Sequence, residues 1–426
     1  MDVLERARAD EVELVELQFS DILGSTKAVA IVPEHLEAAL AEGVAFDGSA
    51  LEGFARAEES DMLLMPIPET YACLPWERDP RVARLLCLIL LPDQRPSPYC
   101  PRSALERVVA KLGARGFEPW VSAEIEFFLF PRTTPPGPPE PGEHAGYFDL
   151  APGDRGERCR REIVQALRAM GVNVEASHHE VAPGQHEVDL AVMPALAAAD
   201  AVLTVRQTAR MVAERHDLLA SFMPKPLVGQ NGSGMHLTEI LKRGGQNAFD
   251  DPAGPWGLSL VGRQFLAGLL MHAMGLSAVI CPVVNSYKRL VPGFEAPDRV
   301  GWAEHHRSPF VRLPGERGER CRFELRAPDP SANPYLALAA TLAAGLSGIE
   351  SGAVPPNPLP HDHPGEALRL PRDLGEALLA LDEDEVVQRA IGVEVAERLI
   401  EARSLEWEVY CTQVHPWEWD QYGATF

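Results

Sequence analysis

The chain has 426 residues, of which 46% are hydrophobic, so it is long enough for a large core and for more than one domain. Its formal net charge of -23 would repel phosphate backbones and anionic lipid, which argues against a nucleic acid or a membrane surface as a partner. Seven cysteines without a CxxC pair predict neither a disulfide framework nor a zinc site, and we expect a cytoplasmic protein without a signal peptide.

The first hundred residues show strand patterns and one short helix. Residues 12–32 contain two strand-like runs joined by a turn, which predicts a hairpin, and "PEHLEAALAEG" predicts a helix that ends at Gly43. Another strand is expected over residues 81–91. The proline-punctuated stretch after it, with Ser103 well placed to begin a helix, predicts a domain boundary near residue 100.

The rest of the chain mixes strands and helices and is expected to form one large α+β domain. Strands are predicted in "EIEFFLF" and "RFELR", helices over 158–171, 201–216 and 334–350, and surface loops over 131–146 and 351–373. Residues 265–284 are apolar, but they include His272, Ser277 and Pro282. They therefore predict a buried core helix and not a membrane span.

Two carboxylates stand side by side in "VSAEIEFFLF", residues 121–130. The alternation of a strand places Ile125 and Phe127 on one face, and Glu124 and Glu126 on the other. Neighbouring carboxylates repel each other and are costly to bury unless a positive group lies between them.

Two further acidic clusters follow along the chain. Glu180 and Glu187 flank a Pro-Gly turn that can bring their carboxylates together, and Glu324 shares one strand face with Arg322 and Arg326. Each cluster alone is typical of a solvated sheet face. Together the five glutamates are sufficient to hold two hard divalent cations, such as Mg²⁺ or Mn²⁺, which prefer oxygen ligands.

A histidine and several arginines complete the pattern. The glycine-rich turn "GQNGSGMH" leads into His236, which is either a hydrogen-bonded histidine beside a flexible loop or a sixth metal ligand. Arg289, Arg307 and Arg312 suit phosphate or carboxylate oxygens, although surface ion pairs are the alternative. Two cations with several arginines indicate phosphoryl transfer from a nucleotide to a small acid.

Taken together, these motifs resemble those of bacterial and archaeal type I glutamine synthetase, of the alpha-type subclass that is not adenylylated. The resemblance runs from near residue 12 to the C-terminus through "FDGSALEGFARAEESDM", "EIEFFLF", "SHHEVAPGQHE", "FMPKPLVGQNGSGMH", "NSYKRLVPGFEAP", "RFELRAPDPSANPYLALAATLAAGL" and "TQVHPWEWDQY". It implies a β-grasp domain over residues 1–100 and a catalytic domain over residues 101–426, whose curved antiparallel sheet forms a metal-binding funnel. It also implies a dodecamer of two hexameric rings, with active sites between subunits.

The resemblance implies two or more Mg²⁺ or Mn²⁺ ions per active site, with ATP as co-substrate. By motif position, one cation would be held by Glu126, Glu180 and Glu187, and the other by Glu124, His236 and Glu324.

The implied reaction joins ammonia to the γ-carboxylate of L-glutamate through γ-glutamyl phosphate, with release of ADP and phosphate. By motif position, Arg307 and Arg326 would contact the phosphate, and Arg312 would contact the nucleotide. Glutamate would be held by Arg289, Arg326, Asn231 and Gly232. Asp47 and Tyr147 would bind ammonium, and Glu295 would lie in a flap that closes over the site. Asp47 would act as the base for ammonium, and Glu295 would take a proton from the tetrahedral adduct.

The chain departs from the family at Ala50, where members usually have serine. The lost hydroxyl leaves an alternative open, a γ-glutamyl ligase for an alkylamine, ethanolamine or a polyamine. A non-catalytic relative is a third hypothesis, but it should have lost metal ligands, and none is lost. Arg56 matches a position implicated in feedback inhibition by glutamine, although a surface ion pair explains it equally well.

Overall fold

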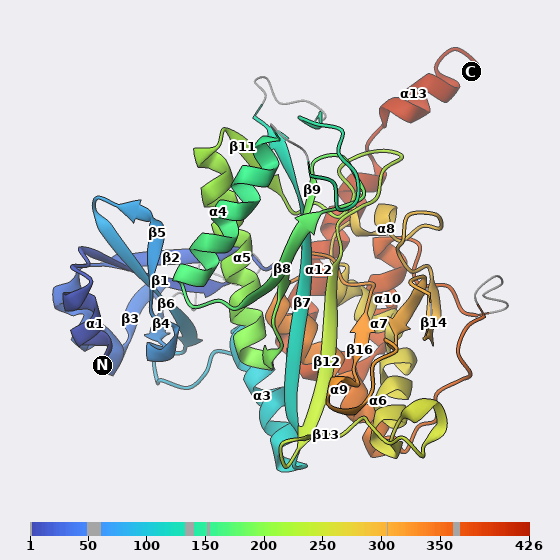
Figure 1. Cartoon of the computed structure of the whole chain (residues 1–426), viewed down its shortest axis with the longest axis horizontal. Helices are drawn as coiled ribbons and strands as arrows, with labels where there is room; N and C mark the ends of the chain where they lie inside the picture. The colour runs from blue at the N-terminus through green and yellow to red at the C-terminus, as the bar shows by residue number, and fades with distance from the viewer. Residues whose placement is uncertain (1, 49–60, 133–139, 151–153, 305, 361–366) are drawn as a thin grey trace.

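Figure 1 shows the chain as a computed structural model, which describes residues 2–48, 61–132, 140–150, 154–304, 306–360 and 367–426. The expectations for Ala50 and Arg56 fall on residues outside these ranges.

The N-terminal part is a six-stranded sheet with two helices. Its strands are β1 (Leu14–Ser20), β2 (Thr26–Ile31), β3 (Val44–Asp47), β4 (Asp61–Pro66), β5 (Ala72–Arg78) and β6 (Arg81–Leu90), and its helices are α1 (Val3–Ala9) and α2 (Leu36–Glu42). The order is β2-β1-β6-β4-β3, with β5 beside β6, and β1 runs parallel to β6. The antiparallel β1/β2 pair confirms the predicted hairpin. The end of α2 is also confirmed, since Gly43 follows it with φ 78, a conformation that glycine adopts without steric cost.

The large sheet has ten strands and curls into a half-barrel (Figure 1). They are β7 (Glu118–Pro131), β8 (Val174–His179), β9 (Gln185–Leu190), β10 (Met193–Pro194), β11 (Leu218–Ser221), β12 (Met235–Arg243), β13 (Gln246–Asn247), β14 (Arg299–Ala303), β15 (Pro309–Arg312) and β16 (Phe323–Leu325). The main order is β14-β15-β16-β12-β7-β9-β8. The pairs along this order are antiparallel, as expected, except for β14 and β15 at one edge, which run parallel.

Most of the remaining helices pack against strands of this sheet or against one another, whereas the last one projects away from the rest of the chain (Figure 1). They are α3 (Pro101–Ala114), α4 (Arg155–Ala169), α5 (Ala195–Arg215), α6 (Leu260–Met271), α7 (Ala273–Ile280), α8 (Ser286–Arg289), α9 (Pro334–Ser351), α10 (Leu374–Glu383), α11 (Glu385–Ile391), α12 (Val393–Cys411) and α13 (Pro416–Tyr422). The α+β class is therefore confirmed. Three predicted starts are wrong. Helix α3 begins at Pro101, before Ser103, and α4 begins at Arg155 instead of residue 158, because Asp154 caps it. Helix α5 begins at Ala195, because its alanine-rich first turns favour helix.

The apolar segment 265–284 lies in two helices instead of one. Helices α6 and α7 break at His272 and are bent by 72° relative to each other. Most of their residues are buried, which confirms the core location. Within the described ranges, no single helix meets the length and composition of a membrane span, and only this bent pair does so when its two members are taken together.

Candidate active site

Strand β7 provides the centre of the site. Its alternation is as predicted: Ile125 and Phe127 are fully buried in the main core, while Glu124 and Glu126 point to the concave side. In the register with β12, Glu124 lies opposite His236, and in the register with β9, Glu126 lies opposite Glu187. Two acidic residues of one strand face are therefore placed beside different neighbours.

The turn between β8 and β9 and the short strand β16 bring in the other carboxylates. The backbone N–H of Glu180 donates to the carbonyl of Gln185 at 2.8 Å, and Gly184 completes the turn with φ 73. On the other side of β12, Glu324 lies in register with Thr238 and with Arg312 of β15.

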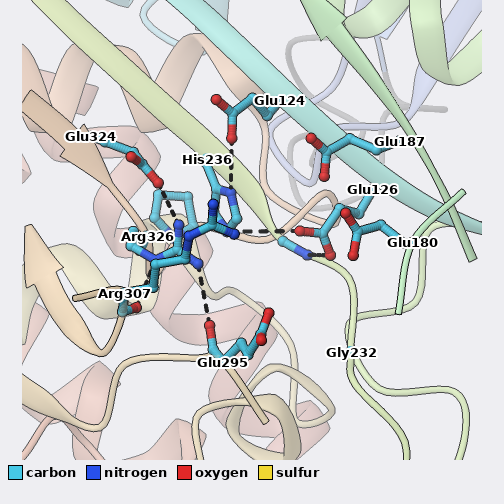
Figure 2. A network of polar contacts seen from close by, with 12 residues as sticks. Glu124, Glu126, Glu180, Glu187, Gly232, His236, Glu295, Arg307, Glu324 and Arg326 are labelled. Atoms are coloured by element: carbon cyan, nitrogen blue, oxygen red, sulfur yellow. Dashed lines mark hydrogen bonds and ion pairs between the residues drawn. The ribbon is translucent and has the colours of Figure 1, made fainter. Parts of the chain in front are cut away.

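These residues line a cavity of about 190 Å³, around which the polar network of Figure 2 is arranged. Fourteen of the predicted site residues line it: Glu124, Glu126, Tyr147, Glu180, Glu187, Asn231, Gly232, His236, Arg289, Glu295, Arg307, Arg312, Glu324 and Arg326. Three further residues line it that the sequence analysis did not single out, namely Gln185, Asp189 and Phe294.

One candidate metal cluster consists of Glu124, His236 and Glu324, which each offer a ligand atom within 4.8 Å of the others. The Nδ1 atom of His236 lies 3.2 Å from a carboxylate oxygen of Glu124. Burial, followed by the charge of Arg326, holds the pKa of His236 well below its usual value. The imidazole is therefore neutral, which is the form that binds a metal ion.

A second candidate cluster consists of His178, Glu180 and Glu187. The Nε2 atom of His178 lies 2.9 Å from Glu180 and 3.9 Å from Glu187. The sequence analysis missed His178, although the signal was present: it stands two residues before Glu180, and in the sheet it lies opposite Glu187. Glu126 borders this cluster and accepts hydrogen bonds of 2.9 Å from the Gln185 side chain and the Gly234 backbone.

Glu126, Glu180 and Glu187 lie too close together for all three to be ionised without a cation. Although burial opposes it, the hydrogen bond with His178 holds the pKa of Glu180 below its usual value, so the other two carboxyl groups are the ones that stay protonated. Burial and the neighbouring Glu180 raise the pKa of Glu126 to about 8, and burial and Glu126 raise the pKa of Glu187 to about 12. The cavity is lined by seven carboxyl groups and four arginines. If every one of these groups is ionised, the cavity carries three more negative charges than positive ones. Clustered oxygen donors with excess negative charge fit hard divalent cations well.

The side chains of Arg326 and Arg312 are held by one network, which also includes the backbone carbonyl of Arg307. Arg326 donates from Nη1 to Glu324, from Nε to the carbonyl of Arg307 at 2.7 Å and from Nη2 to the carbonyl of Glu295 at 3.3 Å (Figure 2). Arg312 donates to the other oxygen of Glu324 at 2.7 Å. Although burial opposes it, the charge of Arg326 holds the pKa of Glu324 below its usual value. Glu324 is thus ionised and oriented by two cationic side chains.

Arg289 is buried and is fixed by the backbone beneath the cavity. It donates to the carbonyls of Ala327 at 2.7 Å, Arg326 at 2.9 Å and Pro328 at 3.3 Å. Arginine has five N–H groups, so two are left for a ligand carboxylate. Beside it, a side chain at Gly232 would lie 2.2 Å from the carbonyl of Pro224, so only glycine fits this close approach.

Glu295 and Tyr147 lie at the cavity mouth. The backbone of Glu295 has φ 55, an uncommon conformation for a residue with a side chain. Tyr147 is 41% exposed and its ring packs edge-on against His178 with centroids 5.6 Å apart. Both side chains are accessible to a ligand in the cavity.

Asp47 is not brought into the cavity of its own chain. It lies exposed at the end of β3 in the N-terminal sheet, opposite Asp61 of β4, and does not line the cavity. In Figure 1 this sheet lies to the left of α4 and α5, whereas the strands of the cavity lie to their right.

Comparison with known proteins covers nearly the whole chain. Residues 11–92 match the family "Glutamine synthetase, beta-Grasp domain", and residues 98–422 match "Glutamine synthetase, catalytic domain". The chain is 46% identical over 441 residues to glutamine synthetase of Thermus thermophilus, covering 100% of this chain and 99% of the relative. It is 45% identical over 434 residues to glutamine synthetase of Staphylococcus aureus, covering 99% and 97%.

Solved structures show the same fold. The structure titled "GmaS/ADP complex-Conformation 1" has a TM-score of 0.90 and 33% identity, and "Apo GmaS without ligand" has a TM-score of 0.89 and 34% identity. Each comparison covers 99% of both chains.

Proposed function

The chain belongs to the glutamine synthetase family, and on this premise we propose that the cavity between β7, β9, β12 and β16 is its active site. The activity is that of a glutamate-ammonia ligase: ATP is consumed to join ammonia to the γ-carboxylate of L-glutamate, giving glutamine, ADP and phosphate. The observation that carries the assignment is that two acidic and histidine clusters share one cavity with four arginines. Every predicted metal position keeps its side chain, which argues against a non-catalytic relative.

The enzyme uses divalent metal, and we assign the ligands residue by residue. Glu124, His236 and Glu324 would hold one Mg²⁺ or Mn²⁺ ion, and Glu126, Glu180 and Glu187 would hold another, with His178 beside them. When bound, such cations neutralise the phosphate oxygens of ATP and so lower the barrier to phosphoryl transfer. The excess negative charge and the raised pKa of Glu187 support this assignment.

Phosphoryl transfer makes the carboxylate of glutamate reactive. A carboxylate oxygen attacks the γ-phosphorus, the bond from that phosphorus to the β–γ bridging oxygen breaks, and ADP leaves. Arg289, with Asn231 and Gly232, would hold glutamate. Arg307 and Arg326 would donate to the transferring phosphoryl group, and Arg312 would contact the nucleotide. Because Arg326 is already fixed by three hydrogen bonds, it needs little reorganisation in the transition state.

Amide formation requires a deprotonated nucleophile and the absence of water. Asp47 would take a proton from ammonium bound near Tyr147, and ammonia would then attack the acyl phosphate carbon and displace phosphate. Glu295 would accept a proton from the tetrahedral adduct and close the mouth against water.

We further propose the arrangement that the family resemblance implies. The subunits would form a dodecamer of two hexameric rings in the cytoplasm, with Asp47 of one subunit completing the cavity of its neighbour. The distance of Asp47 from its own cavity supports this arrangement. The domains would be residues 1–100 and 101–426, and the enzyme would belong to the alpha-type subclass without adenylylation, with Arg56 contributing to feedback inhibition.

An isotope experiment tests the proposed reaction path. Glutamate labelled with ¹⁸O in its γ-carboxylate should transfer one label to the released phosphate for each glutamine formed. The variants Glu187→Gln and Glu324→Gln should lose both products together. Glutamine formation with unlabelled phosphate would contradict a γ-glutamyl phosphate intermediate.

A further inference from the structure

Two loops form part of the cavity wall without regular structure of their own. We call residues 229–234 the glycine loop, which carries Asn231 and Gly232, and residues 290–298 the phenylalanine loop, which carries Phe294 and Glu295. Figure 2 shows Gly232 and Glu295 on these separate segments at the border of the polar network. Since neither loop lies in a helix or a strand, contacts between side chains must hold them together.

The phenylalanine loop is held in an unusual conformation. Phe294 stands between Gly293 with φ 91 and Glu295 with φ 55. A residue with a side chain persists in the left-handed region only where its surroundings fix it. One fixing contact is the hydrogen bond of 3.3 Å from Arg326 to the carbonyl of Glu295. The second is at the neighbouring phenylalanine ring.

Lys225 contacts both loops at once. Its ammonium lies 3.6 Å from the ring centroid of Phe294 and donates a hydrogen bond to the carbonyl of Gln230, at the start of the glycine loop. Its backbone is fixed by Asn285, which accepts from the Lys225 N–H at 2.7 Å and donates to its carbonyl at 3.1 Å. Among the described residues, no carboxylate is found to form an ion pair with Lys225, so the ring face and the carbonyl are the partners of its ammonium group.

We propose that Lys225 is a positioning residue that holds the phenylalanine loop against the glycine loop, and so keeps water away from the acyl phosphate. This proposal rests on the proposed function. When the loops part, water can attack the carbonyl carbon of γ-glutamyl phosphate, the bond from that carbon to the phosphate oxygen breaks, and glutamate and phosphate form. The net result is ATP hydrolysis without glutamine.

The test measures the ratio of phosphate released to glutamine formed, with glutamate, ATP, Mg²⁺ and saturating ammonium. The variant Lys225→Met keeps most of the chain length but removes the charge, and should raise the ratio above one. It should also lower kcat/KM for glutamine formation by roughly three- to thirtyfold, the range for a cation over an aromatic ring. Lys225→Arg retains a cation and should stay near a ratio of one.

A matched control lies at the end of β12, away from both loops. Arg243 stands 4.1 Å over the ring of Phe117, and Arg243→Met should remove that contact without changing the ratio. If Lys225→Met does not assemble, Phe294→Leu removes the ring instead and should raise the ratio in the same way. A ratio of one for Lys225→Met or for Phe294→Leu, with glutamine still formed, would overturn the role of Lys225. If the wild-type enzyme forms no glutamine, the proposed function is contradicted instead.

Discussion

Glu239 is a buried carboxyl group on the side of β12 that faces away from the cavity, and it should be protonated at neutral pH. It is fully buried and lies 2.5 Å from the hydroxyl of Thr341 on α9. That hydroxyl has one hydrogen, which also reaches the carbonyl of Ala337 at 2.9 Å. If Thr341 donates to Ala337, its oxygen can accept a hydrogen bond from a protonated Glu239, which satisfies both groups. Burial raises the pKa of Glu239 from 4.5 to about 8.

The raised pKa makes stability depend on pH. Below the unfolded value, Glu239 is protonated in both states and has no effect. As the pH rises from there to the folded value, the unfolded chain loses its proton while the folded chain keeps it, so the free energy of unfolding falls. At about 1.4 kcal/mol per pKa unit, Glu239 lowers the free energy of unfolding by about 1 kcal/mol at about pH 5 and by about 4 kcal/mol at about pH 7.5.

The variant Glu239→Gln is neutral at every pH and can still donate to Thr341. We therefore expect its stability relative to wild type to improve by about 3 kcal/mol between about pH 5 and about pH 7.5. Urea unfolding at both pH values measures the difference. Glu397→Gln, which changes an exposed glutamate on α12, is the control and should show no such trend. Equal differences for Glu239→Gln at the two pH values would refute a protonated Glu239.

Three predictions concern the metal sites and the assembly. Because the pKa of Glu187 is raised to about 12, binding of Mg²⁺ should displace protons, and its affinity should increase as the pH rises. Calorimetry in buffers of different ionisation enthalpy should detect the released protons. Binding heats that do not depend on the buffer would contradict this prediction. The variant Glu187→Gln should bind one cation fewer, as measured by equilibrium dialysis. Its kcat should fall by at least about 100-fold, which is more than the loss of a residue that only hydrogen-bonds to a metal ligand usually causes. An unchanged number of bound cations would show that Glu187 is not a ligand. Mixed oligomers of Asp47→Ala and Arg326→Ala subunits should regain part of the activity that each variant lacks, and no recovery would indicate that each cavity uses its own Asp47.

The side chains around the cavity could be predicted where strand periodicity fixes them. Glu124 and Glu126 follow from alternation against an apolar face, and the register of β7 with β9 and β12 then brings their partners close. His178 obeys the same rule, but the sequence did not single it out because a histidine is more often a hydrogen-bonded side chain than a metal ligand. The sequence also could not indicate that three N–H groups of Arg289 are occupied by backbone carbonyls, because this depends on how the chain folds around residues 326–328.

Helix ends and interruptions were harder to predict. Ser103 has the residue type of an N-cap, but proline at the first helical position moves the start of α3 to Pro101. The break at His272 was not predicted either. The Nδ1 atom of His272 lies 2.8 Å from Asp384, more than a hundred residues later in the chain, so sequence proximity gives no sign of this contact. In the proposed assembly Asp47 serves the cavity of a neighbouring subunit, a relation that strand periodicity and motif spacing within one chain do not predict.

The most direct test compares nucleophiles in one assay. Phosphate release from ATP with glutamate and Mg²⁺ is measured with ammonium, methylamine, ethanolamine or putrescine, and each product is identified by mass. We predict that ammonium gives glutamine with the highest catalytic efficiency. A higher efficiency with any of the amines would contradict glutamine synthesis as the main activity, and would indicate that the proposed ammonium site, with Tyr147 and a neighbouring subunit's Asp47, accepts a larger nucleophile.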